Sequence, residues 1–368
     1  MKILDIDKDV LLRPLQAVSG IVERRHTLPI LSNVLLEIRG SDLNLVATDL
    51  EIQIATSAKL NKAVTDQAVT VSARKLQDIL RALPDNTAVT LDAQEGRLQV
   101  KAGKSRFNLQ TLPAQDFPRL AQGGSATASV KLAQKAFRSL LSLVQYAMAQ
   151  QDIRYYLNGL LLVADGNQLT MVATDGHRLA YASTALKSEV ARSEVIIPRK
   201  AILELGKLLQ DVEEEVEIQL LPNQVRFIFA GIDIVSKVVD GKFPDYTRVI
   251  PTNYKKHFSL DRIVLQQALQ RASILSNEKF RGVRWVLSAN SLRIICSNAE
   301  QEEAEDELVV DYAGEPLDIG FNIVYLLDVL NNLDTELVDC AVGDANSSML
   351  ISVPGNKEFK YVVMPMRI

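Results

Sequence analysis

Ala47-Thr48-Asp49 in the first third of the chain returns as Ala173-Thr174-Asp175, and 126 residues separate the two copies. Two further pairs keep this interval to within one residue: Arg74-Lys75 with Arg199-Lys200, and Phe117-Pro118 with Phe243-Pro244. Several pairs at one interval indicate that a whole module repeats in register. A period this long is the length of a domain, whereas solenoid repeats have periods of about 20–50 residues.

A third, weaker copy follows the first two. Cys296-Ser297-Asn298 is a faint third copy of the Ala-Thr-Asp motif, and Met364-Pro365 lies 252 residues, or two periods, after Leu112-Pro113. A chain of 368 residues has room for three domains of ordinary size. We therefore predict three tandem domains at residues 1–124, 125–253 and 254–368, with linkers at residues 122–125 and 251–253.

The spacing of apolar residues predicts two helices in each module. The first helices are predicted at residues 9–22, 132–148 and 261–275, and the second helices at residues 73–83, 200–209 and 323–333. Alternating segments predict antiparallel strands, and glycine-containing stretches at residues 39–42 and 164–167 predict two hairpin turns. The predicted fold class is α+β, with three similar domains that each combine two helices with antiparallel sheets.

Composition argues against several classes of protein. No apolar run approaches the roughly 18 residues of a membrane span, and residues 1–12 lack the features of a signal peptide. Cys296 and Cys340 lie in apolar runs without the spacing of metal ligands, and we expect both to be reduced core residues. We therefore expect a cytoplasmic protein that does not bind membranes.

The charged residues are unevenly distributed. A net charge of −4 by itself argues against nucleic-acid binding. However, Lys and Arg gather on the predicted helices, while acidic residues gather at residues 213–215 and 300–307. If the helices share one surface, that surface is basic although the chain is acidic. Each cation taken singly also fits an ordinary solvent-exposed charge.

No motif in the sequence carries a recognisable catalytic chemistry. A phosphate-binding loop, a dinucleotide glycine fingerprint, HExxH and CxxC are all absent from the sequence. Thr174-Asp175-Gly176-His177-Arg178 places an Asp two residues before a His, which fits a general base or a metal ligand. No second segment offers further ligands, so we interpret this stretch as a turn on a binding surface. We predict no catalytic residue, no metal and no cofactor. A hydrolase or metal enzyme centred on Asp175 and His177 remains an alternative, as does a monomeric interaction scaffold.

Several longer strings carry a specific resemblance. They are TLPIL at residues 27–31, ATDLE at 47–51, RYYLNG at 154–159, ATDGHRL at 173–179, FPDY at 243–246, SNEKFRGV at 276–283 and YVVMPMRI at 361–368. Together they extend over the whole chain, and several are chemically unusual. The sequence resembles the bacterial DNA polymerase III beta subunits, a family of sliding clamps.

The resemblance implies a closed ring made by a homodimer of three-domain chains, with helices around the hole and sheets outside. Double-stranded DNA would pass through the hole, contacted at its phosphates without sequence preference. The partners would be the DNA polymerase III catalytic subunit, the clamp loader complex, and other polymerases and repair proteins that carry short clamp-binding peptides. The protein would then be a processivity factor and not an enzyme.

The resemblance also places a peptide groove between the second and third domains. Its residues would be Leu157, Thr174, Gly176, His177, Arg178, Leu179, Pro244, Arg248, Val249, Phe280, Asn322, Tyr325, Ser348, Val362, Val363, Met364, Pro365, Met366 and Arg367. An apolar floor would adapt to several peptides, while Arg178, Arg248, His177 and Asn322 would make the polar contacts.

Two further surfaces are predicted. By the same resemblance, the residues facing DNA would be Arg25, Gln151, Tyr155, Tyr156, Arg199 and Lys200. The contact between the two chains would join a basic stretch of the first module to the acidic block at residues 300–307, because their charges are opposite. These seam residues are Lys75, Arg97, Lys104, Arg106, Phe107, Leu109, Ile274, Leu275, Glu300, Glu302, Glu303 and Asp306. A solvated acidic loop is the alternative interpretation of residues 300–307.

Overall fold

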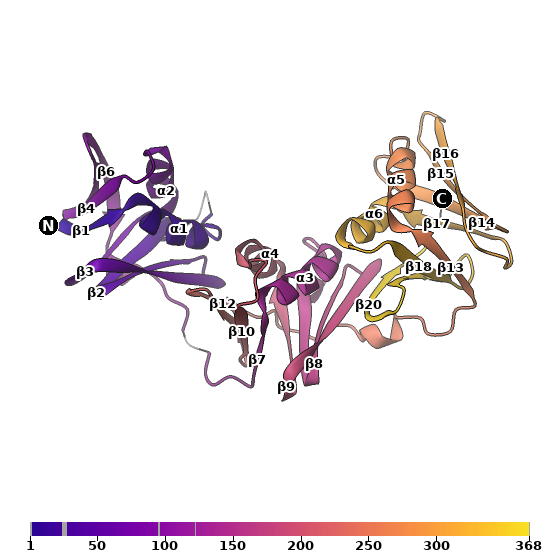
Figure 1. The fold of residues 1–368 in the computed structure, drawn as a ribbon, viewed down its shortest axis with the longest axis horizontal. Helices are drawn as coiled ribbons and strands as arrows, with labels where there is room; N and C mark the ends of the chain where they lie inside the picture. The colour runs from indigo at the N-terminus through magenta and orange to yellow at the C-terminus, as the bar shows by residue number, and fades with distance from the viewer. Residues whose placement is uncertain (1, 24–27, 95, 122, 368) are drawn as a thin grey trace. The chain divides into compact units, whose positions relative to one another are not determined.

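The computed structural model describes residues 2–23, 28–94, 96–121 and 123–367 (Figure 1). Contacts within the chain divide it into two compact units. The first unit comprises Met1–Lys135 and Leu203–Val238, and the second comprises Ala136–Ile202 and Val239–Ile368. The middle module is shared between these units, so the domain boundaries expected at residues 124 and 253 stay a prediction.

The first unit is built on an antiparallel ten-stranded sheet. The strand order is β1-β4-β5-β6-β3-β12-β11-β10-β7, and β2 pairs with β3 beside this path. The strands are β1 (Lys2–Asp7), β2 (Asn33–Thr48), β3 (Ile52–Ser72), β4 (Ala88–Gln94), β5 (Arg97–Ala102), β6 (Ser105–Leu112), β7 (Ala128–Ala133), β10 (Glu215–Leu220), β11 (Gln224–Phe229) and β12 (Ile232–Lys237). Helices α1 (Lys8–Ser19) and α2 (Ala73–Ala82) lie next to each other against it (Figure 1).

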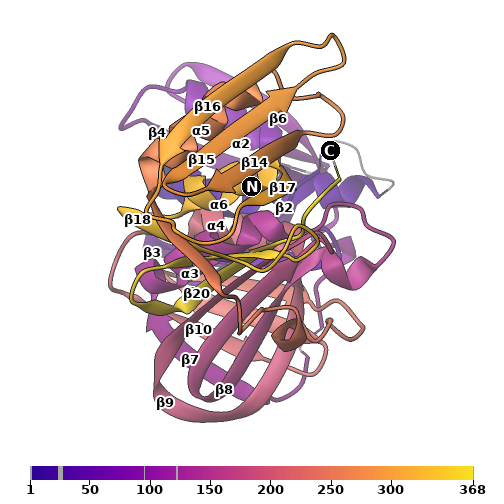
Figure 2. The ribbon, with the colours of Figure 1, turned by 90° about the vertical axis from the view of Figure 1, so that its right-hand side faces the viewer.

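The second unit contains a six-stranded sheet, β13-β18-β19-β20-β9-β8, and a four-stranded sheet, β16-β15-β14-β17. Its strands are β8 (Gly159–Thr174), β9 (Arg178–Pro198), β13 (Lys256–Asp261), β14 (Gly282–Ser288), β15 (Ser291–Ser297), β16 (Glu303–Val309), β17 (Leu317–Asn322), β18 (Leu337–Val342), β19 (Met349–Val353) and β20 (Asn356–Val363). Helices α5 (Arg262–Ser273) and α6 (Ile323–Asn332) pack together, and α5 lies against β15 and β16 (Figure 2). Helices α3 (Gln134–Val144) and α4 (Arg199–Leu208) are each divided between the two units.

The repeat in the sequence is reproduced element by element. β8, β9 and α4 begin and end 126 residues after β2, β3 and α2, respectively. The remaining elements of the second module follow those of the first at the same interval to within one residue. The third copy, from β13 to β20, keeps this order but divides each of the two long strands in two. The prediction of three similar α+β modules is therefore confirmed.

The two predicted hairpin turns are wrong in the first two modules. Residues 39–42 lie inside β2, and residues 164–167 lie inside β8. Gly40 and Gly166 have φ values of 59° and 57°, and the pairing with β3 or β9 shifts register at each of them. The left-handed glycine thus forms a bulge within a continuous strand instead of a turn. In the third module a true two-residue turn, Ala289-Asn290, does separate β14 from β15.

The six predicted helices are all present, and their ends differ from the expected ones by at most four residues. The helix expected at residues 132–148 ends at Val144, because residues 145–147 continue as a 3-10 turn. Cys296 and Cys340 are buried free thiols, as expected of core residues, and burial raises their pKa values to about 11 and about 12, respectively. No helix in the described ranges combines the length and apolar character needed to cross a membrane.

Candidate functional site

The repeated Ala-Thr-Asp motif forms a hairpin turn. The Thr174 hydroxyl donates to the carbonyl of Arg178 at 2.6 Å and accepts from the amide of Gly176 at 3.1 Å. Asp175 Oδ1 accepts from the amides of His177 and Arg178 at 2.9 and 3.0 Å. Thr48 and Asp49 make the same four bonds in the first module. The interpretation of this stretch as a turn is therefore confirmed, and Asp175 is engaged in holding the turn together.

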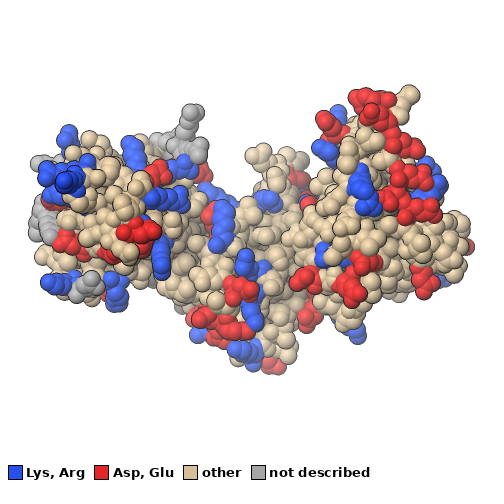
Figure 3. Space-filling model, turned by 45° about the horizontal axis from the view of Figure 1, so that its top comes forward, with Lys and Arg blue, Asp and Glu red and all other residues tan. Residues whose placement is uncertain are grey.

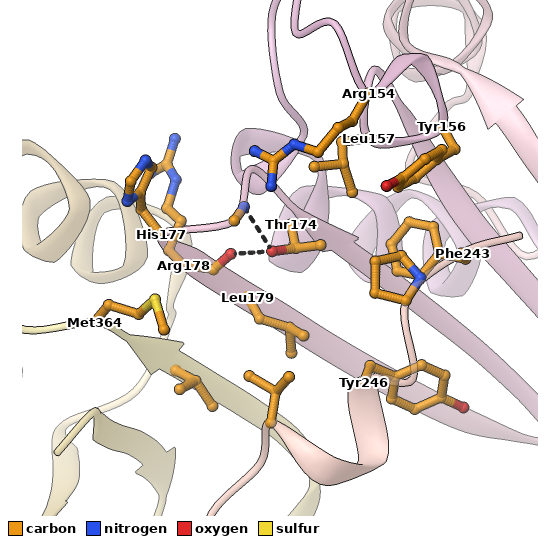
Figure 4. Close-up of a pocket in the computed structure, with 14 residues that line it drawn as sticks. Arg154, Tyr156, Leu157, Thr174, His177, Arg178, Leu179, Phe243, Tyr246 and Met364 are labelled. Carbon is orange, nitrogen blue, oxygen red and sulfur yellow. Dashed lines mark hydrogen bonds between the residues drawn. The ribbon is translucent and has the colours of Figure 1, made fainter.

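An apolar pocket of about 200 Å³ opens beside this turn in the second unit (Figure 4). Leu179 lies at its centre, with Arg154 and His177 on one side and with Met364 and Tyr246 at opposite ends (Figure 4). The floor is the face of the sheet formed by β8, β9 and β20, where Leu179 and Val362 pack with five further buried apolar side chains: Leu161, Val163, Val172, Ile196 and Phe243. An extended segment with apolar side chains can bury them here.

Many of the expected groove residues line this pocket. They are Leu157, Thr174, Gly176, His177, Arg178, Leu179, Pro244, Val249, Val362 and Met364. Four lining residues were not assigned to the groove from the sequence: Arg154, Tyr156, Phe243 and Tyr246. Phe243 and Tyr246 belong to the FPDY string, and Arg154 begins the RYYLNG string. The strings that carry the family resemblance therefore already included lining residues that were not assigned to the groove.

The other expected groove residues do not line the pocket. The Arg248 side chain is exposed and pairs with Asp245 at 2.9 Å, and Phe280 is exposed beneath Lys279. Asn322 caps α6 by accepting from the amide of Val324. The rest are placed as follows: Tyr325 against Arg178, Ser348 3.1 Å from the Tyr254 hydroxyl, Val363 in the core, and Pro365, Met366 and Arg367 along the C-terminal segment. Their part in a groove stays a prediction.

Arg178 is buried and its guanidinium is held within the protein. Nη1 donates to Asp328 at 2.6 Å, Nε donates to Asp175 at 3.1 Å, and Nη2 donates to the carbonyl of Tyr146 at 2.6 Å. The Tyr325 ring lies 4.3 Å from the guanidinium carbon. Burial alone would lower the pKa of Arg178, but the surrounding acidic groups raise it overall. Arg178 therefore ties β9 to α6 and supports one wall of the pocket.

Arg154 covers the turn. Its Nε and Nη2 donate to Asp152 at 3.0 and 2.9 Å, and Nη2 also lies 3.3 Å from the carbonyl of Asp175. Hydrogen bonds from the side chain and amide of Arg154 lower the pKa of Asp152 to about 2. The ion pair therefore stabilises the fold above the ordinary carboxyl pKa, and this contribution is lost only as the pH falls through about 2. Gly176 gives Arg154 the room to lie there, since a Cβ would stand 2.8 Å from Nη2.

The first unit contains the counterpart of this pocket, and it is polar. Gln53 and Leu120 lie 126 residues before Leu179 and Tyr246, and both line a pocket near residues 119–126. The Gln53 side chain accepts from the amide of Leu120 at 3.0 Å, and Gln224 donates to the carbonyl of Ala121 at 2.9 Å. In the first unit, polar side chains thus hydrogen-bond to the backbone of Leu120 and Ala121. At the corresponding place in the second unit, the pocket has an apolar floor. This difference favours one apolar groove per chain.

The residues expected to face DNA have different surroundings. Tyr155 is 58% exposed and Gln151 is exposed, whereas Tyr156 lines the apolar pocket. Arg199 is half-buried and donates to the carbonyl of Met148 at 3.1 Å; burial lowers its pKa, and the charge of Arg178 lowers it further. Lys200 is half-buried, and Arg25 lies outside the described residues. A DNA contact for these residues stays a prediction.

Several seam residues lie on or directly before two strands at sheet edges, β6 and β16, while Lys75 lies on α2 and Ile274 and Leu275 follow α5. β6 pairs with β5 along residues 105–110 and with β3 only at Thr111 and Leu112. β16 pairs only with β15 among the described strands. Lys75, Arg97, Lys104 and Arg106 are exposed on the first unit, and Glu300, Glu302 and Glu303 are exposed on the second. Acidic side chains also gather where the third module lies, on the right in Figure 3.

The remaining seam residues are less uniform. Ile274 is 79% exposed, and Leu275 and Phe107 are half-buried. Leu109 is already buried within its own module, and Asp306 pairs with Arg271 at 2.6 Å within the chain. Leu109 and Asp306 are therefore less available for contact with a second chain than the sequence indicated.

The described residues contain no group of three or more His, Cys, Asp or Glu side chains that could hold a metal ion. Asp175, at the centre of the alternative enzymatic interpretation, accepts hydrogen bonds from two amides and from the Arg178 side chain. These bonds hold the carboxylate in the turn.

Comparisons with known proteins agree over the whole chain. Models of the N-terminal, central and C-terminal domains of the DNA polymerase III beta subunit match residues 1–121, 131–245 and 247–367, respectively. The beta sliding clamp of Pseudomonas putida is 49% identical over 365 residues, covering 99% of both chains. The Escherichia coli K12 clamp is 44% identical over 363 residues, again covering 99% of both chains.

Solved structures give the same result. The crystal structure of the DNA polymerase III subunit beta from Pseudomonas aeruginosa matches with a TM-score of 0.96 and 48% identity, covering 100% of both chains. A clamp from the same organism bound to griselimycin matches with a TM-score of 0.95 and 48% identity over 99% of both chains. The three repeated modules, the pocket beside the second Ala-Thr-Asp turn and these matches agree, and the chain belongs to the DNA polymerase III beta subunit family, the beta sliding clamps.

Proposed function

We propose that this chain forms a homodimeric ring around duplex DNA and tethers the DNA polymerase III catalytic subunit to it. The clamp loader complex, other polymerases and repair proteins would use the same groove through short peptides. Family membership over the full length supports the ring. The chain would have no catalytic activity of its own, and it would act in the cytoplasm, where bacterial DNA is copied.

The observation that carries the tethering role is the apolar pocket around Leu179. It is open, its floor is a rigid sheet face, and Arg154 and His177 provide polar groups on one side. A peptide that inserts Leu or Phe side chains would bury them against Leu179 and Val362, and a Gln could satisfy the polar groups. Several partners can share one such site because the recognised segment is short.

The two sheet edges support the dimer. β6 presents Arg106 and has Lys104 just before it, while β16 presents Glu303 and is preceded by Glu300 and Glu302. Unpaired strand edges readily add another strand, and opposite charges favour the pairing of a basic edge with an acidic one. Each chain has one edge of each kind, so two chains can satisfy both edges and close a ring.

Deleting residues 364–368 tests the tethering role. Met364 forms one end of the pocket and its amide donates to the carbonyl of His177 at 2.9 Å, while the Met366 amide donates to Gly320 at 2.8 Å. The deletion removes this wall, so affinity for a fluorescein-labelled peptide with one Gln and Leu-Phe anchors should fall at least about tenfold. Fluorescence anisotropy measures the affinity, and light scattering checks that the dimer persists.

Ile153→Ala is the matched control, because Ile153 is 96% exposed and does not line the pocket. Its peptide affinity should equal that of the unaltered protein. Unchanged affinity in the truncated, folded dimer would show that the groove lies elsewhere.

A further inference from the structure

The face of the sheet that forms the pocket floor continues beyond the pocket. β20 pairs with β9 so that Val362 stands opposite Leu179 and Lys360 stands opposite Tyr181. Residues two apart on a strand point to the same face, about 7 Å further along. Tyr181 and Lys360 therefore lie on the same face as the pocket floor, one step beyond it.

Tyr246 connects the pocket with this extension. It lines the pocket, at the opposite end from Met364 (Figure 4). Its ring centroid lies 6.0 Å from that of Tyr181, at an interplanar angle of 38°. Both rings are half-buried and pack against the buried cluster that includes Leu179 and Val362. Together they form an aromatic shelf at the end of the pocket.

Lys360 gives this shelf a positive charge. Its ammonium lies 5.4 Å from the centroid of the Tyr181 ring, and the side chain is half-buried. Within the described ranges, Lys360 forms no ion pair, although Glu358 lies two residues before it in the sequence. A partly desolvated ammonium over an aromatic ring attracts an anion more strongly than a fully hydrated one does.

Two sets of nearby charges are paired with one another. Arg192 pairs with Asp165 at 2.9 Å and with Glu194 at 3.1 Å. Asp245, one residue before Tyr246, pairs with Arg248 at 2.9 Å, and the charge of Lys242 also acts on Asp245. Among the described residues that make up the shelf, Lys360 carries the positive charge that can bind a ligand.

We propose that the peptide groove extends onto the shelf of Tyr246, Tyr181 and Lys360, where Lys360 binds a carboxylate next to the peptide's apolar anchors. The carboxylate can belong to an Asp or Glu side chain or to the C-terminus of the partner chain. The two tyrosine rings pack against the carbon atoms that carry it. This inference rests on the proposed tethering function and adds a preference among partners to it.

Four labelled peptides with the same Gln and Leu-Phe anchors test this extension. In two of them a Glu stands immediately before or immediately after the anchors, and the C-terminus is amidated. The third peptide is the neutral one, because a second Gln replaces this Glu and the C-terminus is amidated. The fourth peptide keeps the second Gln but has a free C-terminal carboxylate. Anisotropy titrations give each dissociation constant at low and at high salt.

At least one carboxylate peptide should bind the unaltered protein about two- to fivefold more tightly than the neutral peptide, as expected for a partly exposed ion pair. This ratio should shrink at high salt. Lys360→Gln should reduce it to about one while leaving the affinity for the neutral peptide unchanged. Lys357→Gln is the matched control, because Lys357 is exposed and lies before the part of β20, Phe359–Val363, that pairs with β9, and it should keep the ratio.

The outcomes separate the possible failures. A preference seen only with the free C-terminus assigns the carboxylate to a chain end, and a preference seen with Glu assigns it to a side chain. A neutral peptide that binds as tightly as every carboxylate peptide overturns the shelf but leaves the groove in place. A ratio that survives Lys360→Gln also overturns it. If no peptide binds the unaltered protein, the proposed tethering function itself is wrong.

Discussion

At the residue scale, Arg178 links the fold of the second unit to the candidate pocket. It lines the pocket, yet its guanidinium bonds to Asp175 in the turn, to Asp328 on α6 and to the carbonyl of Tyr146. Its side chain is only 9% exposed. A buried cation with this many partners is strongly coupled to its surroundings, because removing it leaves carboxylates without a counter-charge. The turn is therefore a preformed wall of the groove.

Arg178→Met should destabilise the protein by about 3–5 kcal/mol, because Asp175 and Asp328 would lose their partner in a partly desolvated site. Urea unfolding followed by circular dichroism measures the change. Arg248→Met is the control: Arg248 is 87% exposed in its pair with Asp245, and the cost should be about 0–1 kcal/mol. Equal stability of the two variants would mean that the buried network contributes little.

Gly176 permits a second test at this turn. Its φ is +89°, and an added Cβ would meet Arg154. Gly176→Ala should cost about 1–2 kcal/mol of stability through its backbone conformation. It should also weaken peptide binding, because the Arg154 guanidinium must move. In Gly355→Ala the φ is +73° and nothing lies within 4 Å of the new methyl group, so only stability should fall. Equal peptide affinities in the two variants would contradict this role for Gly176.

At the scale of elements, two of the strand edges carry opposite charges. The edge of β6 is basic and that of β16 is acidic. Directly after α5, Ile274 is exposed and the next residue, Leu275, is partly buried. Exposed aliphatic side chains next to a charged edge are typical of a surface that a partner covers. The third module therefore carries the features of one half of an interface, and the first module those of the other.

Ile274→Ala combined with Leu275→Ala should convert the dimer mostly to monomer. Each truncation of an aliphatic side chain that is buried between chains costs about 2–5 kcal/mol, so the dissociation constant should rise by at least about a hundredfold. Mass photometry at nanomolar concentration measures the ratio of species. Ile263→Ala with Val264→Ala, in the first turn of the same helix, should remain dimeric. A fully dimeric Ile274, Leu275 variant would rule out this seam.

The helices and the repeat could be predicted from the sequence because apolar spacing and recurring strings are local signals. The bulges at Gly40 and Gly166 could not, since a glycine with positive φ fits a turn as well as a bulge, and the choice depends on pairing with β3 or β9. The family resemblance assigned ten residues that line the pocket, nine of them within the quoted strings. It could not show that Arg178 is held internally, because its bond to Asp328 joins segments far apart in the chain.

At the scale of the whole molecule, the proposed function requires an acidic chain to enclose DNA. Arg74 and Lys75 are the second and third residues of α2, and Arg199 and Lys200 are the first and second residues of α4. Repeated modules thus present cations at corresponding helix starts, while many acidic side chains lie on β16 and the segment before it. Contacts of this kind are made with phosphates and weaken steeply with salt. A ring does not need tight contacts, because a closed ring around DNA without free ends cannot dissociate sideways.

The last prediction follows from that topology. The clamp loader complex and ATP should place the protein on a nicked circular plasmid, and gel filtration at 150–200 mM salt should recover it with the DNA, where direct phosphate contacts are expected to be weak. Cutting the same plasmid once with a restriction enzyme should release it, because the ring slides off the ends. The seam variant Ile274→Ala, Leu275→Ala should not be retained even on the circle. Equal retention before and after cutting would mean that contact strength, and not enclosure, holds the protein on DNA.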